Sequence, residues 1–351
     1  MPLDPVALAH DLCAIDSTSG QEGAVVAWLE RRLAANGWQV RRIPVTPGRD
    51  DLFVEGGRPA EVVLSTHLDT VPPFVPPRLE EARLYGRGSC DAKGIAAAMV
   101  CAAARLRERG VPVGLLFVVG EETTHDGAHA ANAAQPTLAP QVRALIAGEP
   151  TESALGSGTK GALRFVLRTE GRAAHSAYPH LGRSAIDRLV DLLGELRALE
   201  LPVDPVLGAT TINVGGLAGG VADNVIAPWA EARCMARLVT PAEVLRARLD
   251  AWIGDRATIG YGVTIPPVRL RTVPGFRSEV VAYATDVPAL DRWGAPLLFG
   301  PGSIHVAHTD GEFVELAELR AAVEAYERLA TAAVALPPAP AAPGGHALQG
   351  A

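Results

Sequence analysis

The chain has 351 residues, 48% of them hydrophobic and 20% charged, and its formal net charge is -7. This length suffices for two domains with a substantial core. The acidic balance argues against a general nucleic-acid partner, which needs clustered Lys and Arg. No apolar run approaches the roughly 20 residues of a membrane span, and no secretory signal is visible. With four scattered cysteines and no Cys-x-x-Cys pair, we expect free thiols and a cytoplasmic location.

The first part of the chain alternates predicted helices and strands. Helical periodicity predicts helices within residues 5–36 and over 94–109. Such alternation is typical of an α/β architecture with a mostly parallel sheet, whose carboxyl ends bind ligands. The predicted strands are short apolar runs at 38–45, 52–54, 61–66 and 113–119.

A second unit is predicted from residue 161 to 269. Its patterns give the order β-α-β-β-α-β, which is that of a ferredoxin-like α+β insert. Around residue 270 the chain is expected to return to the first domain, which would then comprise 1–160 and 270–336. The tail, 337–351, is rich in Pro, Ala and Gly and is predicted to be disordered.

Polar side chains of metal-ligand type follow the predicted buried strands. His67 and Asp69 come after the apolar run 62–64, and residues i and i+2 of a strand point to the same side. Asp69 can therefore accept the imidazole N–H and orient the other ring nitrogen toward a metal. Taken alone, a His-x-Asp pair is weak evidence for such a site.

Further residues of this kind stand later in the chain. Glu121 and Glu122 follow the run 115–119, Glu149 follows 144–147, Asp91 precedes the helix at 94–109, and His308 comes near the end. Two imidazoles and three carboxylates without a thiolate suit catalytic zinc or a related ion better than a structural cysteine site. These candidate ligands are His67, Asp91, Glu122, Glu149 and His308.

The order of these motifs resembles a family of co-catalytic zinc hydrolases. The family includes aminoacylase, acetylornithine deacetylase, succinyl-diaminopimelate desuccinylase and carboxypeptidase G, and the resemblance runs from about residue 5 to about 335. Within it, the segments Tyr283-Ala284-Thr285-Asp286 and Gly300-Pro301-Gly302-Ser303-Ile304 look most like acetylornithine deacetylases. The motifs are His67-Leu68-Asp69-Thr70-Val71-Pro72, Gly86-Arg87-Gly88 through Asp91-Ala92-Lys93-Gly94, Glu121-Glu122 and His308-Thr309.

The resemblance implies two divalent metal ions, zinc first, with cobalt or manganese as alternatives. Asp91 would bridge the ions, His67 and Glu149 would complete one site, and Glu122 and His308 would complete the other. Glu121 would be the general base that takes a proton from the bridging water and passes it to the leaving nitrogen. An isolated Glu-Glu pair is usually a solvated strand end.

The predicted insert carries its own candidates by resemblance. His175, in the segment 171–177, would donate a hydrogen bond to the tetrahedral intermediate in a partner subunit, which implies a homodimer formed through 161–269. Asn224 and Arg237 would grip a substrate carboxylate or the oxyanion. Two departures from the family pattern are Met235, where Asp is common, and one extra residue in the Asn-Val-Ile-Ala-Pro element at 224–228. Gly302 would let the backbone approach the substrate closely.

The leading hypothesis is therefore a metal-dependent hydrolase of N-acyl amino acids, with an acetylornithine-deacetylase-like activity first. A dipeptidase or carboxypeptidase with the same dinuclear site is the alternative. A non-catalytic metal-binding protein and a phosphohydrolase are less favoured, since all ligands and Glu121 are present and no basic phosphate-binding cluster accompanies them. His125 and His129 are interpreted as a solvated helix face, and His305 is left open as a pocket residue.

Overall fold

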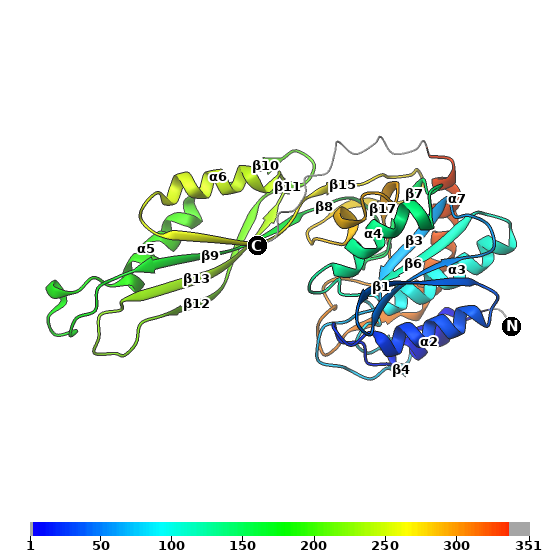
Figure 1. Cartoon of the computed structure of the whole chain (residues 1–351), viewed down its shortest axis with the longest axis horizontal. Helices are drawn as coiled ribbons and strands as arrows, with labels where there is room; N and C mark the ends of the chain where they lie inside the picture. Colours follow the sequence, from blue (N-terminus) through cyan, green and yellow to red (C-terminus); the bar gives the residue numbers. More distant parts are fainter. Residues whose placement is uncertain (1–2, 337–351) are drawn as a thin grey trace. The chain divides into compact units, whose positions relative to one another are not determined.

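The computed structural model describes residues 3–336, and the tail predicted to be disordered lies outside them. The chain divides into two compact units (Figure 1). Unit 1 runs through Ser157 and includes Leu270–Glu279 and the chain from Thr285 onward. Unit 2 comprises Gly158–Arg269 and Val280–Ala284. None of the helices within residues 3–336 combines the length and apolar character needed to span a bilayer.

Unit 1 is built on a six-stranded sheet in the order β1-β2-β6-β3-β7-β17. The neighbours β6, β3, β7 and β17 run parallel, whereas β1 and β2 pair antiparallel at one edge. Its central strands are buried along their whole length and mostly apolar, as expected where helices cover both faces of a parallel sheet. The predicted α/β fold with a mostly parallel sheet is confirmed. The strands are β1 (Gln39–Thr46), β2 (Arg49–Glu55), β3 (Val62–His67), β6 (Val113–Val118), β7 (Ala144–Ala147) and β17 (Ala295–Leu298).

Helices pack on both faces of this sheet because neighbouring strand residues point to opposite sides. Val62 and Leu64 of β3 belong to one apolar core with α1, α2, α3 and α7. Val63 belongs to another with α4 and Trp293. The helices are α1 (Pro5–Cys13), α2 (Gly23–Ala34), α3 (Lys93–Glu108), α4 (Asp126–Leu138) and α7 (Leu316–Val334), with the short η2 (Val287–Leu290).

Two small three-stranded sheets complete the description of the strands. One small sheet has the order β18-β5-β4, and the strands β15, β8 and β16 form another where the chain passes from one unit to the other. Their bounds are β4 (Arg78–Glu80), β5 (Arg83–Tyr85), β18 (Phe313–Glu315), β8 (Leu155–Thr159), β15 (Val268–Arg269) and β16 (Ser278–Val281).

Unit 2 is an antiparallel sheet with two helices on one face (Figure 1). The sheet has the order β12-β13-β9-β14, and its elements follow the chain in the expected β-α-β-β-α-β order with a small hairpin added. Leu163, Phe165 and Leu167 of β9 face the helices and form the core with them. The elements are β9 (Gly161–Glu170), η1 (Pro179–Leu181), α5 (Ala185–Ala198), β10 (Val203–Asp204), β11 (Gly208–Ala209), β12 (Thr211–Gly219), β13 (Trp229–Leu238), α6 (Ala242–Ile253) and β14 (Thr258–Ile265).

Candidate metal centre

The candidate ligands of unit 1 gather at the carboxyl edge of its sheet. His67 is the last residue of β3, Glu121 and Glu122 lie just after β6, and Glu149 lies just after β7. Because β3, β6 and β7 are parallel neighbours, their carboxyl ends meet at one edge. Asp91 stands two residues before α3.

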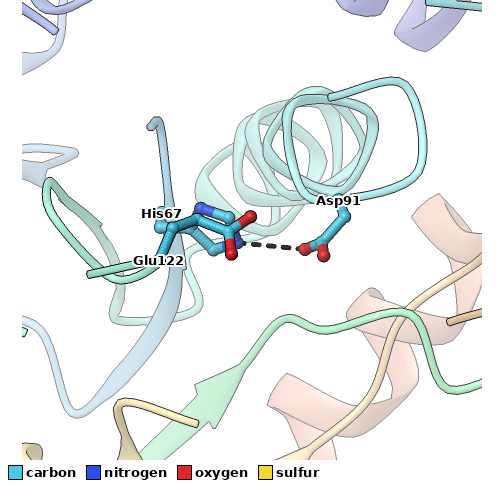
Figure 2. Close-up of side chains that lie close together, drawn as sticks. All are labelled: His67, Asp91 and Glu122. Atoms are coloured by element: carbon cyan, nitrogen blue, oxygen red, sulfur yellow. Dashed lines mark hydrogen bonds and ion pairs between the residues drawn. The ribbon is translucent and has the colours of Figure 1, made fainter. Parts of the chain in front are cut away.

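Asp91 lies between two histidines and contacts each with a different carboxylate oxygen. His67 Nε2 is 3.0 Å from Asp91 Oδ1, and His308 Nε2 is 3.2 Å from Asp91 Oδ2. His308 Nε2 is also 2.9 Å from Glu122 Oε1. Figure 2 shows the Asp91 carboxylate directed at the His67 ring, with the Glu122 carboxylate beside it. The structure thus brings His67, His308 and Glu122 together around Asp91.

The electrostatics of this cluster fit bound cations. Burial raises the pKa of Glu149, and the charge of nearby Asp91 raises it further. Hydrogen bonds with Asp91 and then Glu122 raise the pKa of His308 to about 10. Buried carboxylates repel one another unless positive charge lies among them. A set of imidazole and carboxylate donors supplies the ligands that zinc and related divalent ions take, so the residues fit the expected metals.

Asp69 holds the main chain of the Glu121-Glu122 loop. Its carboxylate accepts the backbone N–H groups of Glu121 at 3.1 Å and Glu122 at 3.2 Å, and the Ser19 hydroxyl at 2.8 Å. The closest acceptor for His67 Nδ1 is the Asp69 main-chain oxygen at 2.9 Å, while the Asp69 carboxylate is 3.5 Å away. Asp69 therefore orients His67 chiefly through its backbone and the glutamate loop through its side chain.

The two adjacent glutamates belong to different clusters. Glu122 groups with His67 and Asp91, whereas Glu121 groups with His125 and Asp286. Burial raises the pKa of Glu121 well above its ordinary value, and repulsion from Glu149 and Asp286 adds to this. A carboxylate with these surroundings can accept and hold a proton, which is the property of a general base.

The pair of His125 and Asp286 was missed by sequence reasoning. His125 is not on a solvated helix face as expected: it precedes α4 with a left-handed backbone (φ 53°), and its side chain is largely buried. Its Nδ1 lies 2.6 Å from Asp286 Oδ1. His129 and His305 are exposed. Only the placement of Asp286 in a family-like segment pointed to this region, and nothing in the sequence linked it to His125.

Glu312 was also missed, although it shapes the loop that carries Asp91. It accepts the backbone N–H groups of Gly88, Cys90 and Asp91 and forms an ion pair with Arg87 at 2.6 Å. Arg87 and Glu312 are each only 1% exposed. Arg87 belongs to a recognised motif, but an isolated Glu gives no sequence signal.

Gly302 lies beside this loop and has a positive φ of 85°. A Cβ atom there would lie 2.5 Å from Cys90 Sγ, so the position requires glycine both for its backbone and for its space. The close approach seen here is to Cys90, a neighbour of Asp91.

The remaining candidates lie in unit 2. His175 forms a β-bridge with Val225, and Ser176 N–H donates to the Asn224 carbonyl at 2.9 Å, so the His175 and Asn224 loops lie side by side. Arg237 is half-buried and lies near the carboxyl-terminal end of β13, whereas the His175 and Asn224 loops adjoin the other end of that strand. The eight residue steps from Trp229 to Arg237 span roughly 26 Å at about 3.3 Å per residue, so the structure does not bring Arg237 to the other two.

A mostly parallel α/β sheet with imidazoles and carboxylates at its carboxyl edge is typical of metal-dependent hydrolases. Residues 63–332 match the model of peptidase family M20/M25/M40. Together with the relatives below, this match shows that the chain belongs to that family. It is an enzyme family of hydrolases that act on peptide and amide bonds.

Several curated relatives share most of this chain. A probable carboxypeptidase of Aspergillus terreus is 42% identical, over 93% of this chain and 85% of the relative. A peptidase M20 domain-containing protein of Schizosaccharomyces pombe is 38% identical, over 92% of this chain and 83% of the relative.

Solved structures share the fold at low identity. A tripeptidase from Staphylococcus aureus covers 95% of this chain and 99% of its own, with a TM-score of 0.79 at 19% identity. A metallo-carboxypeptidase of family M20 from Sulfolobus solfataricus covers 95% and 100%, with a TM-score of 0.74 at 17% identity. The family-level resemblance is confirmed, whereas the narrower likeness to acetylornithine deacetylases stays a prediction.

Proposed function

We propose that the protein is a dinuclear metallohydrolase that cleaves the peptide bond next to a free carboxylate, as a carboxypeptidase or dipeptidase does. The observation that carries this proposal is Asp91, whose two oxygens face two different imidazoles while Glu121 belongs to a separate cluster. The names of the curated relatives favour a carboxypeptidase.

The proposed metal sites share Asp91. His67 and Glu149 would complete one site, and Glu122 and His308 the other, with zinc first and cobalt or manganese as alternatives. A solved relative from Bacillus subtilis, matching with a TM-score of 0.71 at 15% identity, is described as a dinuclear metal-binding peptidase of family M20. When bound, such a pair of cations supplies an activated water and polarises the scissile carbonyl.

Glu121 is proposed as the general base. It would take a proton from the attacking water and deliver it to the departing amine nitrogen, because it lines the same small cavity as His67 and Glu149. Asp69 would keep this carboxylate in place, since its side chain holds the backbone N–H of Glu121.

Unit 2 is proposed to act as a lid and dimerisation domain. His175 and Asn224 lie together at one end of the sheet, and Arg237 lies roughly 26 Å from that end. A single small substrate cannot contact both ends of β13 in one chain. We therefore propose a homodimer in which His175 and Asn224 contact the substrate of the partner subunit, and the substrate-binding role of Arg237 stays a prediction.

The alternative within the same chemistry is a deacylase of N-acyl amino acids, which the segments 283–286 and 300–304 favour. Rates should be compared on dipeptides, N-acylated dipeptides and N-acetylornithine after loading with zinc and then cobalt, each peptide also as its C-terminal amide. Preference for free-carboxylate peptides supports the carboxypeptidase proposal. Preference for N-acetylornithine would establish the deacylase instead, and equal cleavage of the amides would refute carboxylate recognition.

A further inference from the structure

The sheet of unit 2 has one face without helices. On β9 and β13, every second residue points away from α5 and α6, and from Arg164 onward on β9 and throughout β13 these outward residues are half-buried or exposed. Four of them are arginines: Arg164 and Arg168 on β9, and Arg233 and Arg237 on β13. We call this set, with the residues between them, the arginine face.

The strand register places these arginines in a staggered row. Met235 is opposite Arg164, and Glu231 is opposite Arg168, so Arg233 is the diagonal neighbour of both β9 arginines. Diagonal neighbours on adjacent strands lie about 7–8 Å apart. Arg168 is paired with Glu231 at 3.2 Å. Within the described residues 3–336, Arg164, Arg233 and Arg237 form no ion pair with a carboxylate.

Glycines on the flanking strands leave room for these side chains. A Cβ atom at Gly216 of β12 would lie 2.8 Å from Arg233 Nη2, and one at Gly260 of β14 would lie 3.7 Å from Arg168 Nη1. An open hollow of about 650 Å³ is lined by Arg164, Arg168 and Arg233, together with Asn213 of β12 and residues 260–262 of β14. The guanidinium groups are thus accommodated by the sheet and remain accessible from outside.

Gathering like charges here is unfavourable without a counter-charge. Burial lowers the pKa of Arg237, and the positive charge of Arg164 lowers it further. The row is not a by-product of a basic chain, because the net charge is -7. An anionic occupant would relieve this repulsion, and a guanidinium fork binds carboxylates in a bidentate manner.

We infer that the arginine face binds an acidic peptide segment in an extended conformation. Val166 and Met235 lie between the arginines, so the face alternates cationic and apolar positions, which suits a peptide with carboxylate and aliphatic side chains rather than a purely polar polyanion. The Asn213 amide, across from Met235, can form hydrogen bonds with the peptide main chain. The site lies wholly within unit 2, and of its four arginines only Arg237 is also a candidate substrate residue of the proposed function, so the test below changes Arg164 and Arg233 instead.

The test uses fluorescence anisotropy on the full-length protein. The probe is a fluorescent peptide of alternating Glu and Val, N-acetylated and C-amidated so that it offers no terminal carboxylate to Arg237. We expect binding that weakens as salt is raised and that falls about tenfold or more in Arg164→Gln/Arg233→Gln. The matched control is Arg197→Gln on α5, which removes an exposed arginine from the other side of the sheet and should leave binding unchanged.

A charge-swapped variant distinguishes a direct loss of peptide binding from a loss caused by misfolding. Arg164→Glu/Arg233→Glu should no longer bind the Glu-Val peptide and should gain affinity for the matching Lys-Val peptide. The inference is overturned if a Gln-Val peptide binds wild type equally well, if Arg197→Gln weakens binding as much as the double variant, or if the charge swap gains nothing. Tighter binding of oligothymidylate than of the Glu-Val peptide would also overturn it.

Discussion

Replacing Glu312 by Gln should destabilise the protein strongly, although the residue touches no predicted substrate. Glu312 is the only carboxylate within ion-pair distance of Arg87 among residues 3–336, and both side chains are buried. Gln keeps the size and one acceptor oxygen, so the N–H groups of Gly88, Cys90 and Asp91 retain a partner. Arg87 loses its counter-charge and faces an amide instead.

The expected cost follows from this geometry. Removing one partner of a buried ion pair leaves an uncompensated charge and costs about 3–5 kcal/mol. The free energy of unfolding is measured by urea denaturation of the chelator-treated protein, so that metal binding does not enter. The matched control is Glu80→Gln, which breaks the exposed pair of Arg78 and Glu80 and should change the free energy by less than about 1 kcal/mol.

The result that would refute this reasoning is a Glu312→Gln protein as stable as the Glu80→Gln control. Arg87 would then be stabilised without Glu312, by its hydrogen bonds to the Pro73 and Thr309 carbonyls alone. Because Glu312 also holds the Asp91 backbone, we expect Glu312→Gln to weaken metal affinity by about 10–100-fold. Calorimetric zinc titration checks this second effect.

Three further predictions concern the surroundings of the site. Asp69→Asn should lower kcat about 10–100-fold with little change in KM, because Asp69 holds the Glu121-Glu122 backbone; steady-state kinetics showing an unchanged kcat would contradict this. Burial lowers the pKa of His125, but its hydrogen bond with Asp286 outweighs burial and leaves the pKa raised. The pair of protonated His125 with Asp286 therefore stabilises the folded state. This stabilisation is complete below the unfolded pKa of about 6.5 and is lost as pH rises through the folded pKa. In denaturant titrations of chelator-treated protein, the free energy of unfolding of Asp286→Asn should therefore fall furthest below that of wild type in mild acid, and the difference should shrink with rising pH. A difference that stays constant with pH would argue against the pair. Gly302→Ala should lower the free energy of unfolding by about 1–3 kcal/mol, because its Cβ would meet Cys90 Sγ. The control Gly37→Ala, where φ is also positive but the space is open, should lower it less. Equal shifts in thermal unfolding temperature for the two variants would count against the steric argument.

Much of the metal centre could be predicted because its residues follow recognisable strands. The apolar runs that became β3, β6 and β7 deliver His67, Glu121, Glu122 and Glu149 to one edge of a parallel sheet. The strand periodicity alone places these residues there, and the family-like motifs add Asp91 and His308. The sheet order itself was not predicted from the sequence.

The supporting contacts could not be predicted because they join distant parts of the chain. Asp286 reaches His125 and Glu312 reaches the Asp91 loop across more than 150 residues. A helical spacing of His125 and His129 suggested a solvated face, but His125 takes a left-handed backbone before α4 begins. Such tertiary pairings leave no local pattern in the sequence.

The central claim is that Glu121 acts as the base beside a pair of bound divalent ions. The most direct test is Glu121→Gln, with peptide hydrolysis and metal content measured on the same zinc-loaded samples. We predict that the variant keeps two ions per chain, as its candidate ligands are untouched, and loses about 10²–10⁴-fold in rate. A variant that binds both ions and hydrolyses its substrate at the wild-type rate would contradict the account.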